Sequence, residues 1–78
     1  MSKVERKVRA LVAEDGDMRE AIRAVLDHAS DGEVKWVDVR DEITSGQWGR
    51  LIEKGVLVDG ASGFALADRD AIEAGLEP

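Results

Sequence analysis

Cysteine is absent from the 78 residues, and there is no tyrosine and only one proline, one phenylalanine and one histidine. Without cysteine the chain can form neither disulfides nor thiolate metal sites, and a reducing cytoplasm is its expected location. No apolar run approaches the roughly 20 residues of a membrane-spanning helix, and the polar N-terminus has no signal-peptide core. We therefore expect a single domain, residues 1–78, with a small core that acts in water.

Groups suited to catalysis are also scarce. The only histidine, His28, falls at the end of a predicted helix, where interaction with the helix dipole explains it better than general-base chemistry. The acidic triplets at 15–17 and 68–70 offer too few spaced oxygen ligands for a calcium loop. Residues 60–63 have the spacing of a turn and not of a nucleophile elbow. We expect no enzymatic activity, no metal site and no cofactor.

Acidic residues outnumber basic ones, seventeen against eleven, and the net charge is −6. An acidic, lysine-poor and alanine-rich chain resembles proteins of salt-loving archaea. In such proteins molar salt screens self-repulsion, since the Debye length falls to about 3 Å at 1 M. The alternative is an ordinary acidic bacterial domain.

The first ten residues are the exception to this acidity, with a charge of +3 against −9 for the remainder. Four bases lie within seven positions: Lys3, Arg6, Lys7 and Arg9. Such a cluster could contact phosphate, lipid head groups at a membrane surface, or an acidic partner.

Apolar periodicity predicts two amphipathic helices at the start of the chain, over residues 1–14 and 17–29. Asp17 and Glu20 have the spacing of a capping box that begins the second helix. We expect the two helices to form a helical hairpin, which ends in a turn at residues 30–32.

Residues 34–67 have the order of a helix-turn-helix followed by a two-stranded hairpin. After a short strand, Asp38 is a predicted cap of a short helix, and residues 44–46 form the turn before a third helix. Gly55 stands where a helix C-terminus favours a left-handed residue. Strands at 56–58 and 64–67 follow, joined by a glycine-rich turn.

The last predicted element is a short helix over residues 68–75, capped by Asp68 and stopped by Gly75 and Pro78. The fold class is therefore α+β and mostly helical. More specifically, we expect a winged helix-turn-helix with an N-terminal helical hairpin and a C-terminal β-hairpin wing. The C-terminal residues form no element of their own, so a longer parent protein is expected.

The third helix would be the recognition helix of such a fold. Gln47, Arg50 and Lys54 could reach base edges or phosphates. Acidic residues lie beside them in the helix and flank the turn, and a solvated helix face is the alternative interpretation. Trp48 is expected in the core with Trp36, although a tryptophan early in this helix could also anchor a partner protein.

The run EVKWVDVRDEITSGQWGRLIEKGVLVDGASGF, preceded by VERKVRALVAEDGDMREA, resembles the soluble N-terminal region of a haloarchaeal membrane-protein family. That archaeal family is related to the YidC-type insertases. The most specific part is residues 44–60. The resemblance covers nearly the whole chain and ends before any membrane helix of that family. It implies a cytoplasmic accessory domain of a protein-insertion factor, and it carries over no functional residue.

Two functions follow as hypotheses. The first is a non-enzymatic interaction module, held at the cytoplasmic face of the membrane through a missing C-terminal region, that contacts a protein or ribosomal RNA. The second is a small DNA-binding transcription regulator, by analogy with the fold. The net charge of −6 and the acids around the third helix disfavour DNA and support the first hypothesis.

Overall fold

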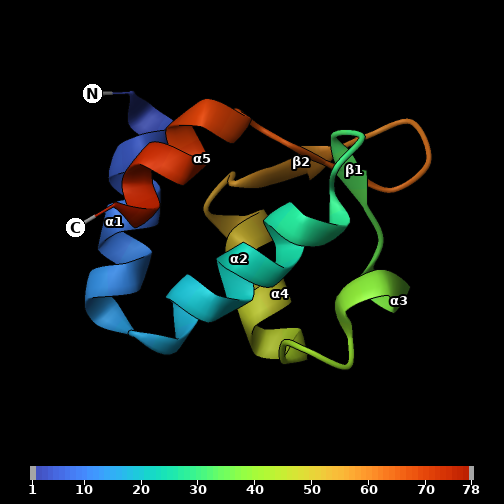
Figure 1. Ribbon diagram of the computed structural model, residues 1–78, viewed down its shortest axis with the longest axis horizontal. Helices are drawn as coiled ribbons and strands as arrows, with labels where there is room; N and C mark the ends of the chain where they lie inside the picture. Colours follow the sequence, from blue (N-terminus) through green and yellow to red (C-terminus); the bar gives the residue numbers. More distant parts are fainter. Residues whose placement is uncertain (1, 78) are drawn as a thin grey trace.

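The computed structural model describes residues 2–77 and shows an α+β fold that is mostly helical, as predicted (Figure 1). Its helices are α1 (Lys3–Glu14), α2 (Asp17–His28), α3 (Trp36–Val39), α4 (Ser45–Glu53) and α5 (Arg69–Leu76). Its strands are β1 (Glu33–Val34), β2 (Leu57–Asp59) and β3 (Phe64–Leu66). None of these helices combines the length and the apolar composition that crossing a bilayer requires.

The turn between α1 and α2 consists of two residues, Asp15 and Gly16. Asp17 is the first residue of α2 and not its cap, so the predicted capping box with Glu20 is wrong. Asp15 takes over this role: its Oδ1 accepts the N–H of Asp17 at 3.0 Å, and its carbonyl accepts the N–H of Met18 at 3.0 Å. A carboxylate at this position satisfies N-terminal donors and suits the positive end of the helix.

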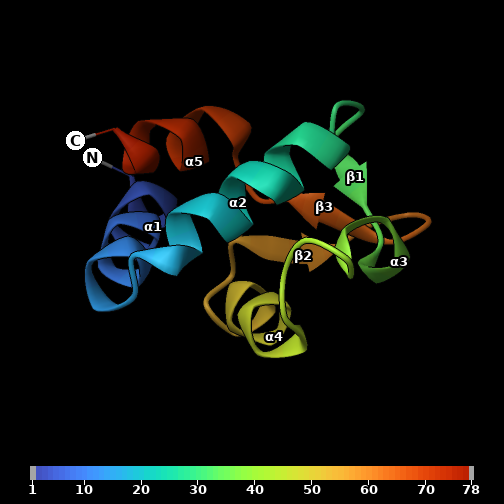
Figure 2. The same ribbon diagram turned by 60° about the horizontal axis from the view of Figure 1, so that its bottom comes forward.

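Helices α1 and α5 lie side by side at one end of the molecule (Figures 1 and 2). Gly75 permits this approach, because a Cβ there would lie 2.7 Å from Cβ of Val8 and 3.0 Å from the carbonyl oxygen of Glu5. The helix continues to Leu76, so the prediction that Gly75 stops it is wrong. Pro78 lies outside the described residues. The N-terminal helices therefore do not pack only on each other, since α1 packs mainly on α5.

Helix α4 begins at Ser45, inside the turn predicted at residues 44–46, and Thr44 is its N-cap. Oγ1 of Thr44 accepts the N–H of Gln47 at 3.1 Å, and Oε1 of Gln47 accepts the N–H of Thr44 at 2.9 Å. These reciprocal bonds form a capping box. Asp38, in contrast, does not cap α3: it lies inside the first turn, where its carboxylate accepts the N–H of Lys35 at 3.0 Å.

The end of α4 depends on Gly55, whose φ of 77° lies in the left-handed region. The N–H of Gly55 donates to the carbonyl of Ile52 at 3.1 Å, and that of Val56 donates to Leu51 at 2.9 Å. Left-handed glycine at this position lets the chain satisfy the last carbonyls and leave the helix directly into β2.

The hairpin that follows belongs to a three-stranded antiparallel sheet with the order β1-β3-β2. Val58 pairs with Ala65, and Ala65 pairs with Glu33 on the other side. The carboxylate of Glu33 also reaches the hairpin turn, where Oε1 accepts the N–H of Ser62 at 3.0 Å. The first strand thus pairs with the hairpin and also contacts its turn.

One hydrophobic core joins residues from every helix and from β1 and β2. Trp48, only 8% exposed, lies within it. Its ring centroid is 5.8 Å from that of Trp36 and 5.5 Å from that of Phe64, the latter in an edge-to-face arrangement that aromatic quadrupoles favour. The same face of α4 buries Leu51 completely and packs Ile52 against the core.

Candidate functional site

The two basic groups predicted from the sequence meet in space. Lys7 of α1 and Lys54, the residue that follows α4, line one cavity of about 170 Å³. Its other lining residues are Ala10, Leu11 and Glu14, all on α1. We call this the α1–α4 cavity. It combines two ammonium groups with an apolar floor, because Leu11 is a core residue that is only 2% exposed.

Lys7 reaches the C-terminal end of α4. A Cβ on Gly55 would lie 3.9 Å from its Nζ, so the ammonium group lies where the negative end of the helix dipole favours a cation. Lys54 belongs to the same helix end. Within residues 2–77 neither lysine takes part in an ion pair or a side-chain hydrogen bond.

Arg50 joins the same face but is already paired. Its Nη2 lies 2.5 Å from Oε2 of Glu14, so the pair connects α4 to the last residue of α1. Both side chains remain substantially exposed, at 41% and 60%, and solvent therefore weakens the pair. Arg50 was predicted to reach a partner on its own. In the structure it would have to leave Glu14 or bind together with it.

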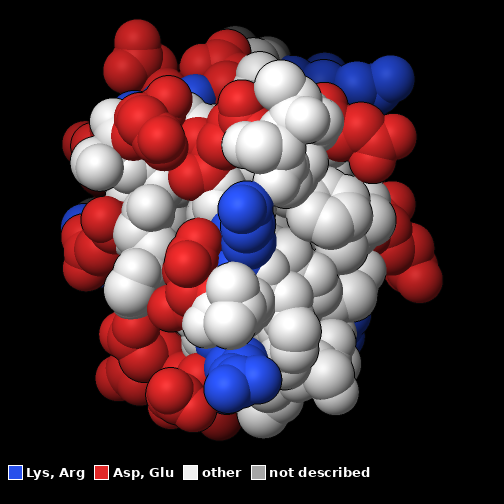
Figure 3. All heavy atoms as spheres, turned by 90° about the vertical axis from the view of Figure 1, so that its right-hand side faces the viewer, with Lys and Arg blue, Asp and Glu red and all other residues white. Residues whose placement is uncertain are grey.

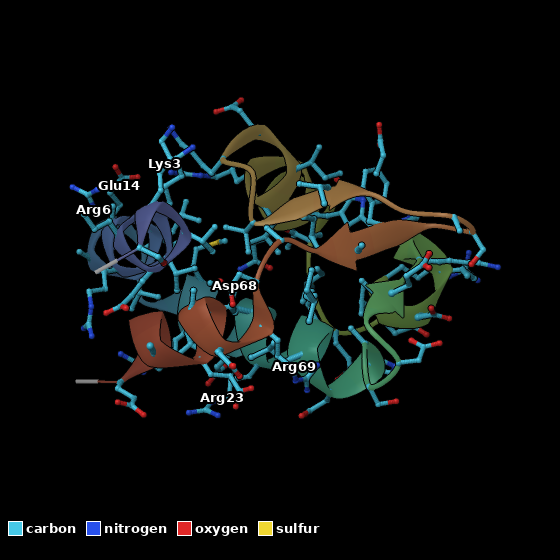
Figure 4. All side chains as sticks on the ribbon, turned by 90° about the horizontal axis from the view of Figure 1, so that it is seen from above. Lys3, Arg6, Glu14, Arg23, Asp68 and Arg69 are labelled. Carbon is cyan, nitrogen blue, oxygen red and sulfur yellow. The ribbon has the colours of Figure 1, made fainter. Side chains whose placement is uncertain are left out.

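The three remaining basic side chains of the N-terminal cluster point in different directions. Lys3 projects from the side of α1 on which α4 lies, whereas Arg6 projects outward (Figure 4). Arg9 turns to α5, where it donates to the carbonyl of Glu77 at 2.9 Å and to that of Ala74 at 3.0 Å. Arg9 therefore caps the C-terminal end of α5.

Two predicted contacts on α4 have structural roles. Gln47 holds the capping box of its own helix. Trp48 lies in the core, as expected, because its ring is enclosed by Trp36 and Phe64 and leaves little surface. Of the eight predicted site residues, Lys7 and Lys54 share the cavity, with Lys3 and Arg50 beside it.

The side of the molecule that carries the β2–β3 hairpin turn differs from the α1–α4 side. The turn of residues 60–63 contains no lysine or arginine. Uncharged side chains fill much of this side, basic ones stand in its middle and near its lower edge, and acidic ones lie mainly along its margins (Figure 3). The exposed large hydrophobic residues among the described ones are Val37, at 57%, and Val58, at 43%.

Sequence reasoning missed Ala10, Leu11 and Glu14 as site residues. Lys7, Leu11 and Glu14 recur at i, i+4 and i+7, so one face of α1 presents all three. That spacing could have revealed a mixed basic and apolar face. What the spacing could not reveal is that the end of α4 closes the cavity, which is a contact between distant parts of the chain.

Comparison of the chain with known protein families, with curated proteins and with solved structures found no match. Across residues 2–77 no three histidine, aspartate or glutamate side chains gather as potential metal ligands.

Proposed function

We propose that this chain is a non-enzymatic winged-helix module that binds a protein partner through the side formed by α1 and α4. The observation that carries the proposal is the order of elements. From α2 onward, helix, strand, helix, helix and hairpin follow one another, and the first strand pairs with the last in the order β1-β3-β2. This order supports a helix-turn-helix with a wing, in which α4 would take the place of the recognition helix.

The charges on α4 and the wing favour protein over duplex DNA as the partner. A winged helix that reads DNA needs several bases to contact phosphates. On α4 the arginine is paired with Glu14, the glutamine caps the helix, and Glu53 is exposed beside Lys54. The wing turn has no base to contribute. Ribosomal RNA is an alternative partner, and a DNA-binding regulator is the alternative function that the element order alone would support.

The setting of the module is a further part of the proposal. Its resemblance to an archaeal family related to YidC-type insertases would place it on the cytoplasmic side of a membrane, as an accessory domain of an insertion factor. The net charge of −6 agrees with a salt-rich archaeal cytoplasm.

Site-specific photo-crosslinking tests the proposal. A photoreactive amino acid replaces Glu53, which is exposed on α4, and in a control it replaces Asp27, which is exposed on α2. Extract of the cells that make the protein is then irradiated with each variant. We expect a discrete product from position 53 alone that protease removes and nuclease leaves intact. A nuclease-sensitive product, or equal labelling from both positions, would refute a protein partner at this face.

A further inference from the structure

We propose that the α1–α4 cavity binds an acidic peptide segment, with one carboxylate between Lys7 and Lys54 and an adjacent apolar side chain on Leu11. The inference rests on the proposed function and names the chemistry of the partner. The inference rests on the arrangement of two lysines. Their ammonium groups have no ion-pair partners in residues 2–77, and both lysines line one cavity above a core leucine.

The charge around the cavity is unusual for this chain. Acids outnumber bases by six overall, yet the cavity has two lysines against one glutamate, and that glutamate is engaged by Arg50. Two like charges near each other repel, and the repulsion grows as solvent is displaced. A carboxylate entering between them would relieve this repulsion and form charge-assisted hydrogen bonds with both.

The apolar lining of the cavity determines which group of the peptide should lie next to the carboxylate. Ala10 and Leu11 provide apolar surface, and a lysine side chain adds its own aliphatic stem to such surface. A cavity of about 170 Å³ has room for several water molecules, each of which occupies about 30 Å³ in the liquid. One apolar side chain can therefore fill it. A group with both an anionic and an apolar part matches this lining better than a bare anion.

The rim of the cavity disfavours a nucleic-acid backbone as the occupant. A nucleic-acid strand carries a phosphate at every nucleotide. Each phosphate that follows the one bound in the cavity would need a further cation nearby. Here Glu14 lines the cavity and Glu53 lies beside Lys54, so the neighbouring phosphates would meet carboxylates. A peptide with one acidic residue next to an apolar one avoids that repulsion.

The test is an NMR titration of the whole chain with an acetylated and amidated tetrapeptide of glycine, glutamate, leucine and glycine. The matched control peptide has glutamine in place of glutamate. We expect a dissociation constant on the order of 1 mM, typical of one small anchor, with shifts centred on Ala10, Leu11 and Gly55. The glutamine peptide should bind at least about fivefold more weakly, because it lacks the charge.

Variants of the protein locate the contact. Lys7→Gln and Lys54→Gln should each weaken binding of the glutamate peptide about fivefold, while Lys35→Gln, a change of an exposed lysine outside the cavity, should leave it unchanged. Thermal melting of each variant shows whether the fold is retained. Lys7 and Lys54 belong to different segments of the chain, so the result of either variant stands even if the other lowers stability.

Four outcomes would overturn the inference: no shifts at the cavity, equal binding of both peptides, equal binding by the cavity variants and the wild type, or tighter binding of a single-stranded oligonucleotide at the same residues. If the peptide fails while position 53 still crosslinks to a protein, the partner lacks this chemistry and the proposed function stands. If position 53 yields only nucleic acid, the proposed function itself fails.

Discussion

Single residues in this small fold have more than one physical role, and glycine shows this most clearly. Gly55 is required for its backbone conformation, with φ of 77°, whereas Gly75 is required for its lack of a side chain. Gly49 has neither constraint: a Cβ there would have no described atom within 4 Å. Replacing glycine by alanine should therefore destabilise the protein at Gly75 and stabilise it at Gly49, although both positions lie in helices.

We predict that Gly75→Ala destabilises the protein by about 1–2 kcal/mol, because the new methyl group would overlap Cβ of Val8 and the carbonyl of Glu5 and push α1 away from α5. Gly49→Ala, the matched control, should stabilise the protein by up to about 1 kcal/mol through helix propensity alone. Urea unfolding at constant salt measures both. Equal effects of the two substitutions would mean that α1 and α5 do not approach as closely as described.

Elements whose signals are local could be predicted from the sequence. Thr44 and Gln47 stand three residues apart in a capping box, and Gly55 separates a helical pattern from a strand. The hairpin follows from apolar runs around a glycine-rich turn. Each of these depends on neighbours along the chain, so a single sequence contains the needed information.

Elements that depend on distant partners could not be predicted in this way. A glycine near the end of a helical pattern, such as Gly75, has the same appearance as a terminator, and only the packing of α1 on α5 shows its purpose. The pairing of β1 with β3 and the contact of Glu33 with the hairpin turn join positions about 30 residues apart. The candidate site has the same origin, since α1 and the end of α4 supply its halves.

The whole molecule has a predominantly acidic surface. No ionisable side chain among the described residues belongs to the buried core, so the seventeen acids mostly repel one another through solvent. Self-repulsion of this kind disfavours the compact state and is relieved by screening. Salt should therefore act on the stability of the entire fold.

We predict that the melting temperature rises by several degrees between about 0.1 M and about 2 M potassium chloride, since the Debye length falls from about 10 Å to below 3 Å over that range. A rise of roughly 4–8 °C would correspond to about 1 kcal/mol for a domain of this size. An uncharged osmolyte at equal osmolality is the control, because it changes burial without screening. If the melting temperature does not change with salt, the acidic composition has a cause other than adaptation to high salt.

The choice between a protein partner and DNA is the central claim about the whole molecule, and titration with duplex DNA at about 100 mM salt tests it most directly. Each phosphate contact contributes a slope of about −0.9 in the salt dependence of affinity, so a face with few free bases binds weakly and loses that binding quickly as salt increases. The amide signals of the chain report where any contact occurs. We expect no shifts on α4 that depend on DNA sequence, and any weak binding should map to Lys3 and Arg6, at the exposed start of α1. Sequence-dependent shifts centred on Gln47 and Arg50 would contradict the account and support a DNA-binding regulator.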